Sequence, residues 1–370
     1  MYKGLKLGLV CLVAAMGLWQ PASAETKVTY GSFVGLSHTA NKYGMQPFIA
    51  NVEKATGGSM KIELHPGGAI ASGKATASAI RDGLMDGGLV VALYTPSVFP
   101  VNTLMSDMGF HSVDPVVSTA AVTEATLLHC PQCLEEWRKN GIEYFGAYTT
   151  PSYKLMCKDA VDNLSDIKGR KMRSAGSVFG NWAKTMEGIP VSMPNAEAYE
   201  ALERGQLDCI IGSSAWLKTL SLWDMVKYVV EEPMGAYMGG AIIDFNTDVW
   251  AGFSPKEKEV ILRETPAALI RIAFGYVKDE DEVAKLAKEK GVNFVPSNPE
   301  LSALKSQFTE ELNVSQAEVA KKRGVKDPEA VIDAILKSLE KWEKIVAEVG
   351  YDQDKLADRL YTEVFSKIKY

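Results

Sequence analysis

The chain has 370 residues, of which 46% are hydrophobic and 23% charged, and its formal net charge is −6. This composition is typical of a globular protein that is long enough to form two domains, each with its own core. The acidic balance argues against nucleic acid as a partner, because proteins that bind its phosphates carry a basic surface.

Residues 1–24 have the three parts of a secretory signal peptide. A basic start is followed by an apolar run over residues 7–19 and by Ala22-Ser23-Ala24, which has the small residues of a cleavage site. A membrane span needs about twenty apolar residues without a break, and Pro21 ends this run too early. We therefore expect cleavage after Ala24 and a mature protein that is free in the periplasm and not inserted in the membrane.

The segment after the leader predicts alternating strands and helices. Strands are expected over residues 28–33, 60–66 and from 89 onward, and helices over 40–55 and 75–84. Tyr94 lies where the third of these strands ends. Its ring could stack on a ligand and its hydroxyl could bond to one, although simple packing is the more common role of a tyrosine.

Residues 112–140 predict a helical insertion that contains Cys130 and Cys133. A disulfide between them requires only the oxidising compartment that the leader implies. A redox-active pair would stand at the head of a helix that follows a strand. A zinc site would require two more ligands, of which only His129 is near in sequence. We expect a structural disulfide, with a free or metal-bound pair as the alternative.

Residues 143–158 predict one long strand that is broken near Pro151. Cys157 lies on this strand, and Cys209 lies on another predicted buried strand. We expect both thiols to be inert packing groups that do not form a second disulfide.

Residues 164–216 predict two βα units in succession, and therefore a parallel sheet. Ligands of open parallel sheets bind beyond the carboxyl ends of the strands, which here carry Arg173, Asn195, Ser213 and Ser214. Arg173 leads into a helix start, where an anion is favoured, and its guanidinium can bind a carboxylate through two hydrogen bonds. A solvated surface arginine is the alternative. The two serines could instead cap the helix that follows.

Trp216 stands at the start of a helix predicted over residues 215–229, where it forms either an apolar wall for a ligand or part of the core. A Gly-rich strand is expected over residues 234–246. From Ser254 onward the pattern is almost wholly helical, with helices expected over residues 255–290, 299–323, 327–348 and 353–367.

Residues 169–208 carry a specific combination of residues at fixed spacing: Gly169, Lys171, Arg173, Gly188, Pro190, Val191, Pro194, Glu197, Tyr199, Ala201, Leu202, Gly205 and Asp208. This combination resembles the central signature of the substrate-binding proteins of TRAP (tripartite ATP-independent periplasmic) transporters, the DctP family. The resemblance extends over nearly the whole mature chain.

The resemblance implies an α/β protein with the two-lobed fold of periplasmic binding proteins. Its lobes would be joined by crossing strands and by a long spanning helix, expected over residues 255–290. The first lobe would comprise residues 25–148 and about 240–275, and the second lobe residues 149–239. Residues 276–370 would form C-terminal helices that pack across both lobes.

The resemblance also implies a ligand site between the lobes, in which Arg173 binds the ligand's carboxylate. Some members, such as the sialic acid binders, carry a second arginine where this chain has Tyr148, an asparagine where it has Gly212 and an aromatic residue where it has Asn195. A sugar acid is therefore not implied, whereas an organic anion is. For His38, a helix-starting residue wetted by solvent is the alternative. The candidate ligand-binding residues are Ser37, His38, Tyr94, Tyr148, Arg173, Asn195, Ser213, Ser214 and Trp216.

The resemblance implies an extracytoplasmic solute receptor that binds a small organic anion, a C4-dicarboxylate or another organic acid. The receptor would deliver this anion to the small and large membrane subunits of a TRAP transporter. Because the sequence has no motif of a hydrolase, a metalloprotease or a nucleotide-binding enzyme, we expect no catalysis, no cofactor and no metal. Two alternatives stay open: a periplasmic thiol-disulfide enzyme that uses Cys130 and Cys133, and a ligand-sensing subunit of a signalling system.

Overall fold

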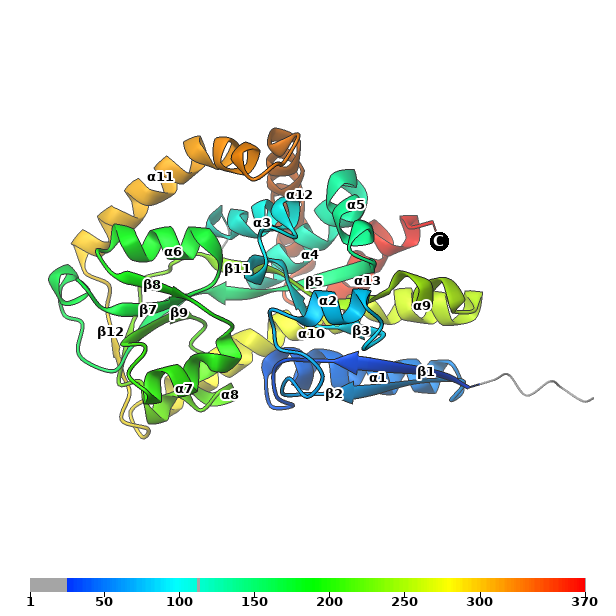
Figure 1. Ribbon diagram of the computed structural model, residues 1–370, viewed down its shortest axis with the longest axis horizontal. Helices are drawn as coiled ribbons and strands as arrows, with labels where there is room; N and C mark the ends of the chain where they lie inside the picture. The colour runs from blue at the N-terminus through cyan, green and yellow to red at the C-terminus, as the bar shows by residue number, and fades with distance from the viewer. Residues whose placement is uncertain (1–24, 112–113, 370) are drawn as a thin grey trace, which may run out of the picture.

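The computed structural model describes residues 25–111 and 114–369 (Figure 1). The signal peptide expected over residues 1–24 lies outside these residues. The described chain forms two lobes, each built around β-sheet. The first lobe contains two three-stranded sheets, with strand orders β2-β1-β3 and β4-β11-β5, and the second contains one six-stranded sheet.

The first sheet of the first lobe is parallel, as the alternation of strands and helices predicts. Strand β1 (Thr26–Gly31) pairs with β2 (Met60–His65) on one side and with β3 (Gly87–Gly88) on the other. The expected helix over residues 40–55 begins as the π-helix η1 (Ala40–Met45) and continues as α1 (Gln46–Ala55). Helix α2 (Thr76–Arg81) leads to β3.

Two long strands carry the chain from one lobe to the other. Strand β5 (Ile142–Ser152) pairs antiparallel with β11 (Ala236–Asn246), whose other neighbour is β4 (Val90–Val91). After Tyr153 the chain continues as β6 (Lys154–Cys157), which belongs to the second lobe. The predicted break in the long strand is confirmed. It falls at Tyr153, whose N–H donates to Gly235 O at 2.8 Å.

The six-stranded sheet of the second lobe has the order β12-β10-β6-β9-β7-β8. Its centre confirms the two predicted βα units, because β7 (Lys171–Ser174) pairs in parallel with both β8 (Ile189–Ser192) and β9 (Cys209–Gly212). The crossover helices α6 (Gly176–Thr185) and α7 (Ala198–Glu203) lie on opposite faces of this sheet (Figure 1). The carboxyl ends of β7, β8 and β9 therefore meet at one edge.

The helix predicted over residues 215–229 is wrong. Helix α8 (Trp216–Thr219) ends after one turn, and Ser221 takes a left-handed backbone conformation with φ of 56°. A short 3₁₀ turn, η7 (Leu222–Asp224), follows, and then β10 (Tyr228–Val230) pairs with both β6 and β12 (Asn293–Val295). The local pattern favours a helix, but residues 228–230 form a strand because they pair with neighbouring strands of the sheet.

Helix α10 (Pro255–Leu286) is the expected long spanning helix and has 32 residues. It begins at Ser254, whose side chain accepts from the Glu257 N–H in a capping box. The helix packs against η1, α1 and β5 of the first lobe and reaches α8 of the second. A shorter helix, α9 (Thr247–Gly252), connects β11 to it.

The C-terminal helices α11 (Pro299–Lys322), α12 (Pro328–Val349) and α13 (Gln353–Glu363) follow β12. Helix α11 arches over α6 toward α12 (Figure 1). Arg323, just beyond its end, contacts both lobes. It donates to Asp107 Oδ2 at 2.9 Å, at the end of α3 (Pro100–Asp107), and to Ser177 Oγ at the start of α6.

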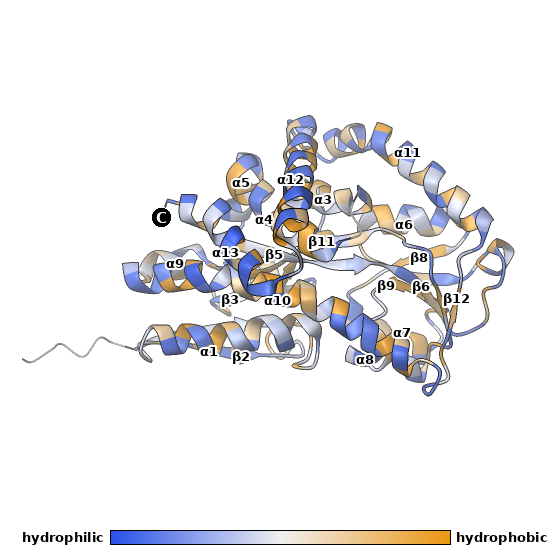
Figure 2. Ribbon diagram, turned by 180° about the vertical axis from the view of Figure 1, so that it is seen from behind, coloured by the Kyte–Doolittle hydropathy of each residue, from blue (hydrophilic) through white to orange (hydrophobic). Residues whose placement is uncertain are grey.

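Hydrophilic and hydrophobic residues alternate along α11 and α12, as expected for helices with one buried face (Figure 2). Within residues 25–111 and 114–369, no helix combines the length and the apolar character that a membrane crossing requires.

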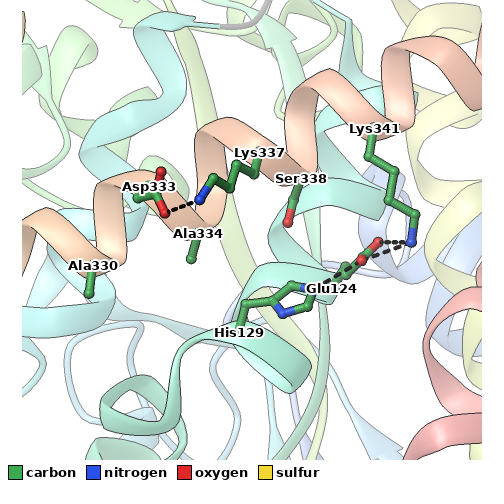
Figure 3. A pocket seen from close by; sticks show the side chains of 8 residues that line it. All are labelled: Glu124, His129, Ala330, Asp333, Ala334, Lys337, Ser338 and Lys341. Carbon is green, nitrogen blue, oxygen red and sulfur yellow. Dashed lines mark hydrogen bonds and ion pairs between the residues drawn. The ribbon is translucent and has the colours of Figure 1, made fainter.

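A buried carboxylate fastens α12 to the first lobe. Glu124, at the end of α4 (Pro115–Glu124), accepts from Lys341 Nζ at 2.9 Å and from Trp342 Nε1 at 2.6 Å. His129 Nε2 lies 3.1 Å from the same carboxylate. Glu124 and His129 line one side of a surface pocket, and residues of α12 line the other (Figure 3). Charge-assisted hydrogen bonds of this kind hold the helix where it lies.

The structure contains two disulfides. Cys130 and Cys133 form the expected bridge at the start of α5 (Pro131–Lys139). Cys157 and Cys209, expected to be unbridged, form a second one. That expectation is wrong because β6 and β9 are adjacent antiparallel strands that place these two residues opposite each other, with Cα atoms 4.1 Å apart.

The second bridge should contribute more stability than the first, because it closes a longer loop. The bridged residues are 52 positions apart in one case and 3 in the other. From loop-closure entropy we expect the double variant Cys157→Ala/Cys209→Ala to lose about 4 kcal/mol of unfolding free energy. The matched variant Cys130→Ala/Cys133→Ala should lose about 1.5 kcal/mol by the same relation. Urea unfolding of both variants measures the difference, and equal losses would contradict this explanation.

Candidate ligand-binding site

Arg173 stands at the carboxyl end of β7, which is the edge at which open parallel sheets generally bind their ligands. The side chain is 1% exposed. Its Nε donates to Met193 O at 3.0 Å and its Nη1 to Ile211 O at 3.2 Å, so the ends of β8 and β9 fix the guanidinium in place. Its Nη2 donates to Tyr94 Oη of the first lobe at 3.4 Å.

No carboxylate within residues 25–111 and 114–369 lies within ion-pair distance of Arg173. Its polar partners are carbonyl and hydroxyl oxygens, and its guanidinium carbon lies 5.2 Å from the Trp216 ring centre. A buried charge is costly unless it is paired, and neutral acceptors offset only part of that cost. The surroundings of Arg173 therefore favour an anion at this position.

Trp216 lies beside Arg173 because Gly212 leaves room for its ring. A Cβ atom at Gly212 would lie 2.2 Å from the Trp216 ring, which no side chain could accommodate. Gly212 is the position at which some relatives were expected to carry an asparagine. In this chain the ring of Trp216 occupies that place, and the guanidinium of Arg173 lies over the face of this ring.

Tyr94 and Asn195 connect the lobes next to Arg173. The Asn195 N–H donates to Tyr94 Oη at 3.2 Å, and the Tyr94 hydroxyl lies 3.4 Å from Asn195 Oδ1. Tyr94 comes from the first lobe and Asn195 from the end of β8, so a sheet end in each lobe contributes to one network. Burial raises the pKa of Tyr94, and its hydroxyl is a neutral donor at physiological pH.

His38 joins the same network from the start of η1. Its Nε2 lies 3.3 Å from the Asn195 side-chain amide, and its ring meets the edge of Tyr276. The solvated alternative for His38 is not what the structure shows, because the side chain is buried. Burial lowers the pKa of His38 to about 4, against a weaker opposing effect of Asp279. The imidazole is therefore neutral at physiological pH.

The three candidate serines lie outside this network. Ser213 Oγ donates to Glu280 Oε1 of α10 at 2.7 Å, and the Ser214 N–H donates to the same oxygen at 3.1 Å. Ser37 is exposed and its hydroxyl lies 3.4 Å from Thr219 O of α8. These serines fasten the second lobe to the spanning helix and to the first lobe.

Tyr148, the remaining candidate, belongs to a buried group of tyrosines that the sequence interpretation only partly found. Its ring stacks on Tyr276 of α10 with centroids 5.8 Å apart and meets the edge of Tyr237. Tyr153 meets the edge of Trp216 at 5.3 Å. Tyr153, Tyr237 and Tyr276 come from the interlobe break, the Gly-rich strand and the long helix, and nothing local in the sequence sets them apart from core tyrosines.

Asp279 of α10, which is not among the residues predicted from the sequence, links the two lobes near His38. It accepts from Thr39 Oγ1 at 2.8 Å in the first lobe and from Lys218 Nζ at 3.2 Å in the second. Asp279 is fully buried. A carboxylate in the long helix thus receives donors from both lobes at the point where they meet.

The buried neutral His38 should make stability depend on pH. The folded-state pKa is about 4 and the ordinary value 6.5, so as the pH falls through this window the unfolded chain binds the proton first. We expect the unfolding free energy of the wild type, relative to that of His38→Gln, to fall by about 2 kcal/mol between pH 7 and pH 4.5. Urea unfolding at both pH values measures this, and parallel pH profiles for the two proteins would contradict it.

Known proteins resemble this chain in sequence and in fold. A "Solute-binding protein" of Albidiferax ferrireducens is 24% identical over 266 residues, which are 67% of this chain and 72% of that protein. A marine metagenome TRAP solute-binding protein from an unidentified microbe, specific for aromatic acids and in complex with metahydroxyphenylacetate, superposes with a TM-score of 0.77 at 20% identity. The match covers 86% of this chain and 99% of that one.

A TRAP periplasmic solute-binding protein of Bordetella bronchiseptica with bound mandelate gives a TM-score of 0.73 at 20% identity, over 85% of this chain and 99% of that one. These structures share the two-lobed fold. The model of the DctP family, described as bacterial extracellular solute-binding protein, family 7, matches residues 31–319. The protein therefore belongs to the DctP family of bacterial extracellular solute-binding proteins.

Proposed function

We propose that this protein is an extracytoplasmic receptor that binds a small organic carboxylate between its lobes and delivers it to the integral-membrane subunits of a TRAP transporter. The observation that carries this proposal is the buried guanidinium of Arg173, fixed at a sheet end without a carboxylate partner among the described residues. Membership of the DctP family supports the receptor role. Mandelate and metahydroxyphenylacetate, bound by the two similar structures, are both carboxylates.

Closure of the lobes would couple binding to delivery. A ligand held by Arg173 and Asn195 of the second lobe gains further contacts from Tyr94 and His38 only when the first lobe is near. Such a ligand stabilises the closed form by the contacts that it makes there and nowhere else. The closed form then presents a joint surface of both lobes to the membrane subunits.

The extent of each lobe and the location of the protein are part of the same proposal. We assign residues 25–148 and about 240–275 to the first lobe, residues 149–239 to the second, and residues 276–370 to helices that pack across them. Strand β12 (Asn293–Val295), in the last segment, adds an edge to the second sheet. Cleavage of the leader after Ala24 would release the receptor into the periplasm.

The alternative of a thiol-disulfide enzyme has little support in the geometry. Cys130 is 3% exposed and Cys133 is 0% exposed. Exchange requires that a thiolate of the substrate reach one of these sulfur atoms, and the surrounding core prevents such an approach. A sensor subunit would use the same ligand site and differ only in its partner.

Replacement of Arg173 by alanine should abolish most ligand binding. Loss of a charge-assisted interaction in a desolvated site costs on the order of 2–5 kcal/mol, which is a thirtyfold to several-thousandfold loss of affinity. A thermal-shift screen of the wild type and Arg173→Ala against organic acids measures this, because a ligand that binds only the folded state raises its stability.

Lys171→Ala is the matched control, because this cation lies on the same strand but is exposed. It should keep the thermal shift of the wild type. If an acid stabilises Arg173→Ala as strongly as the wild type, the carboxylate is bound elsewhere and the proposed site is wrong.

A further inference from the structure

The charges around Arg173 suit a ligand with a single carboxylate. Lys154, on the strand beside the site, is 3.6 Å from Glu280 and donates to Ser214. His38 is neutral, and burial raises the pKa of Tyr94, so its hydroxyl is neutral too. Within the described residues, the groups that contact Arg173 and Asn195 add no second cation. A second carboxylate would be surrounded by neutral donors and would lose hydration without gaining a counter-charge.

The walls near Arg173 are aromatic, and glycines on two strands make room for them. A Cβ at Gly212 would lie 2.2 Å from the ring of Trp216, and a Cβ at Gly240 would lie 2.5 Å from the ring of Tyr148. The absence of a side chain at Gly212 leaves room for the ring of Trp216, and its absence at Gly240 leaves room for the ring of Tyr148. Flat aromatic faces gain most from a second ring, through stacked or edge-to-face contacts worth about 0.5–1.5 kcal/mol beyond the area that they bury.

One hydroxyl in this aromatic group has no partner. Tyr237 is 4% exposed, and its Oη makes no hydrogen bond within residues 25–111 and 114–369. Its ring meets the edge of Tyr148 at 6.3 Å, and burial raises the pKa of its hydroxyl well above the ordinary value. Tyr237 therefore belongs to the buried tyrosine group that includes Tyr148 and Tyr276. A buried hydroxyl without a partner is costly and points to a ligand that would satisfy it.

We infer that the ligand is an aromatic monocarboxylate that carries a hydroxyl group, with its carboxylate on Arg173, its ring among Trp216 and Tyr148, and its hydroxyl bonded to Tyr237 Oη. This inference rests on the proposed receptor function and narrows it to one class of organic acid. Tyr237 then determines specificity, since it distinguishes hydroxylated aromatic acids from their parent acids.

Calorimetric titration of the mature protein with a matched series of acids tests the inference. The series contains phenylacetate, its three ring-hydroxylated isomers, cyclohexylacetate and succinate. Phenylacetate should bind more tightly than cyclohexylacetate, which has a similar size without a π face, and succinate should bind weakly. One hydroxylated isomer should bind about fivefold more tightly than phenylacetate, as a neutral hydrogen bond of about 1 kcal/mol provides.

In Tyr237→Phe the hydroxylated isomer should bind no more tightly than phenylacetate, so the fivefold advantage is lost. The affinity for phenylacetate itself should not change. The control Tyr30→Phe removes a buried hydroxyl that donates to Ile242 O at 2.6 Å, and it should keep the advantage. Melting temperatures of both variants verify that each is folded. If Tyr237→Phe is unfolded, the comparison of phenylacetate with cyclohexylacetate in the wild type still decides on the aromatic class.

Equal binding of phenylacetate and cyclohexylacetate would overturn the inference, as would a hydroxyl advantage that survives in Tyr237→Phe. Tight binding of succinate that is lost in Arg173→Ala would also overturn it, but would leave the receptor function intact. Binding of the acids that is unchanged in Arg173→Ala would instead show that the proposed site itself is wrong.

Discussion

The architecture of the site depends on one buried cation. Arg173 is fixed by two backbone carbonyls at the ends of neighbouring strands and by a tyrosine of the opposite lobe, and no carboxylate pairs with it among the described residues. A charge in this setting cannot be explained by fold stability alone, because a neutral side chain of similar volume would pack at lower cost. We propose that its task is to bind an anion and that the aromatic and hydroxyl groups around it select which anion binds.

Long-range connections keep these groups together. The spanning helix α10 provides Tyr276 behind Tyr148, Glu280 for the serines that follow β9, and Asp279 for donors from both lobes. Arg323, after α11, contacts both lobes at another point. A two-lobed receptor has to move and still close to a single geometry, and interactions with one rigid helix restrict how the lobes can approach each other.

Much of the second lobe could be predicted from the sequence because its signals are local. The strands and helices between residues 164 and 212 follow short periodic patterns, and parallel pairing places Arg173 and Asn195 at one edge. The prediction of a helix over residues 215–229 was wrong because residues 228–230 pair with β6 and β12, two strands that are distant in the sequence. The disulfide between Cys157 and Cys209 was missed for a related reason, since strand order decides which cysteines are opposite each other.

The sequence by itself determined the class of protein, because the signature that indicates it lies within residues 169–208. It also predicted that Arg173 stands at a strand end, because the βα units around it are local. Only the tertiary structure decided which candidates meet. It brought His38, Tyr94 and Asn195 together, turned Ser213 and Ser214 toward Glu280, and added Tyr237. These outcomes depend on contacts between residues far apart in the sequence, whose partners and burial are fixed when the two lobes and α10 pack. A residue type alone cannot carry that information.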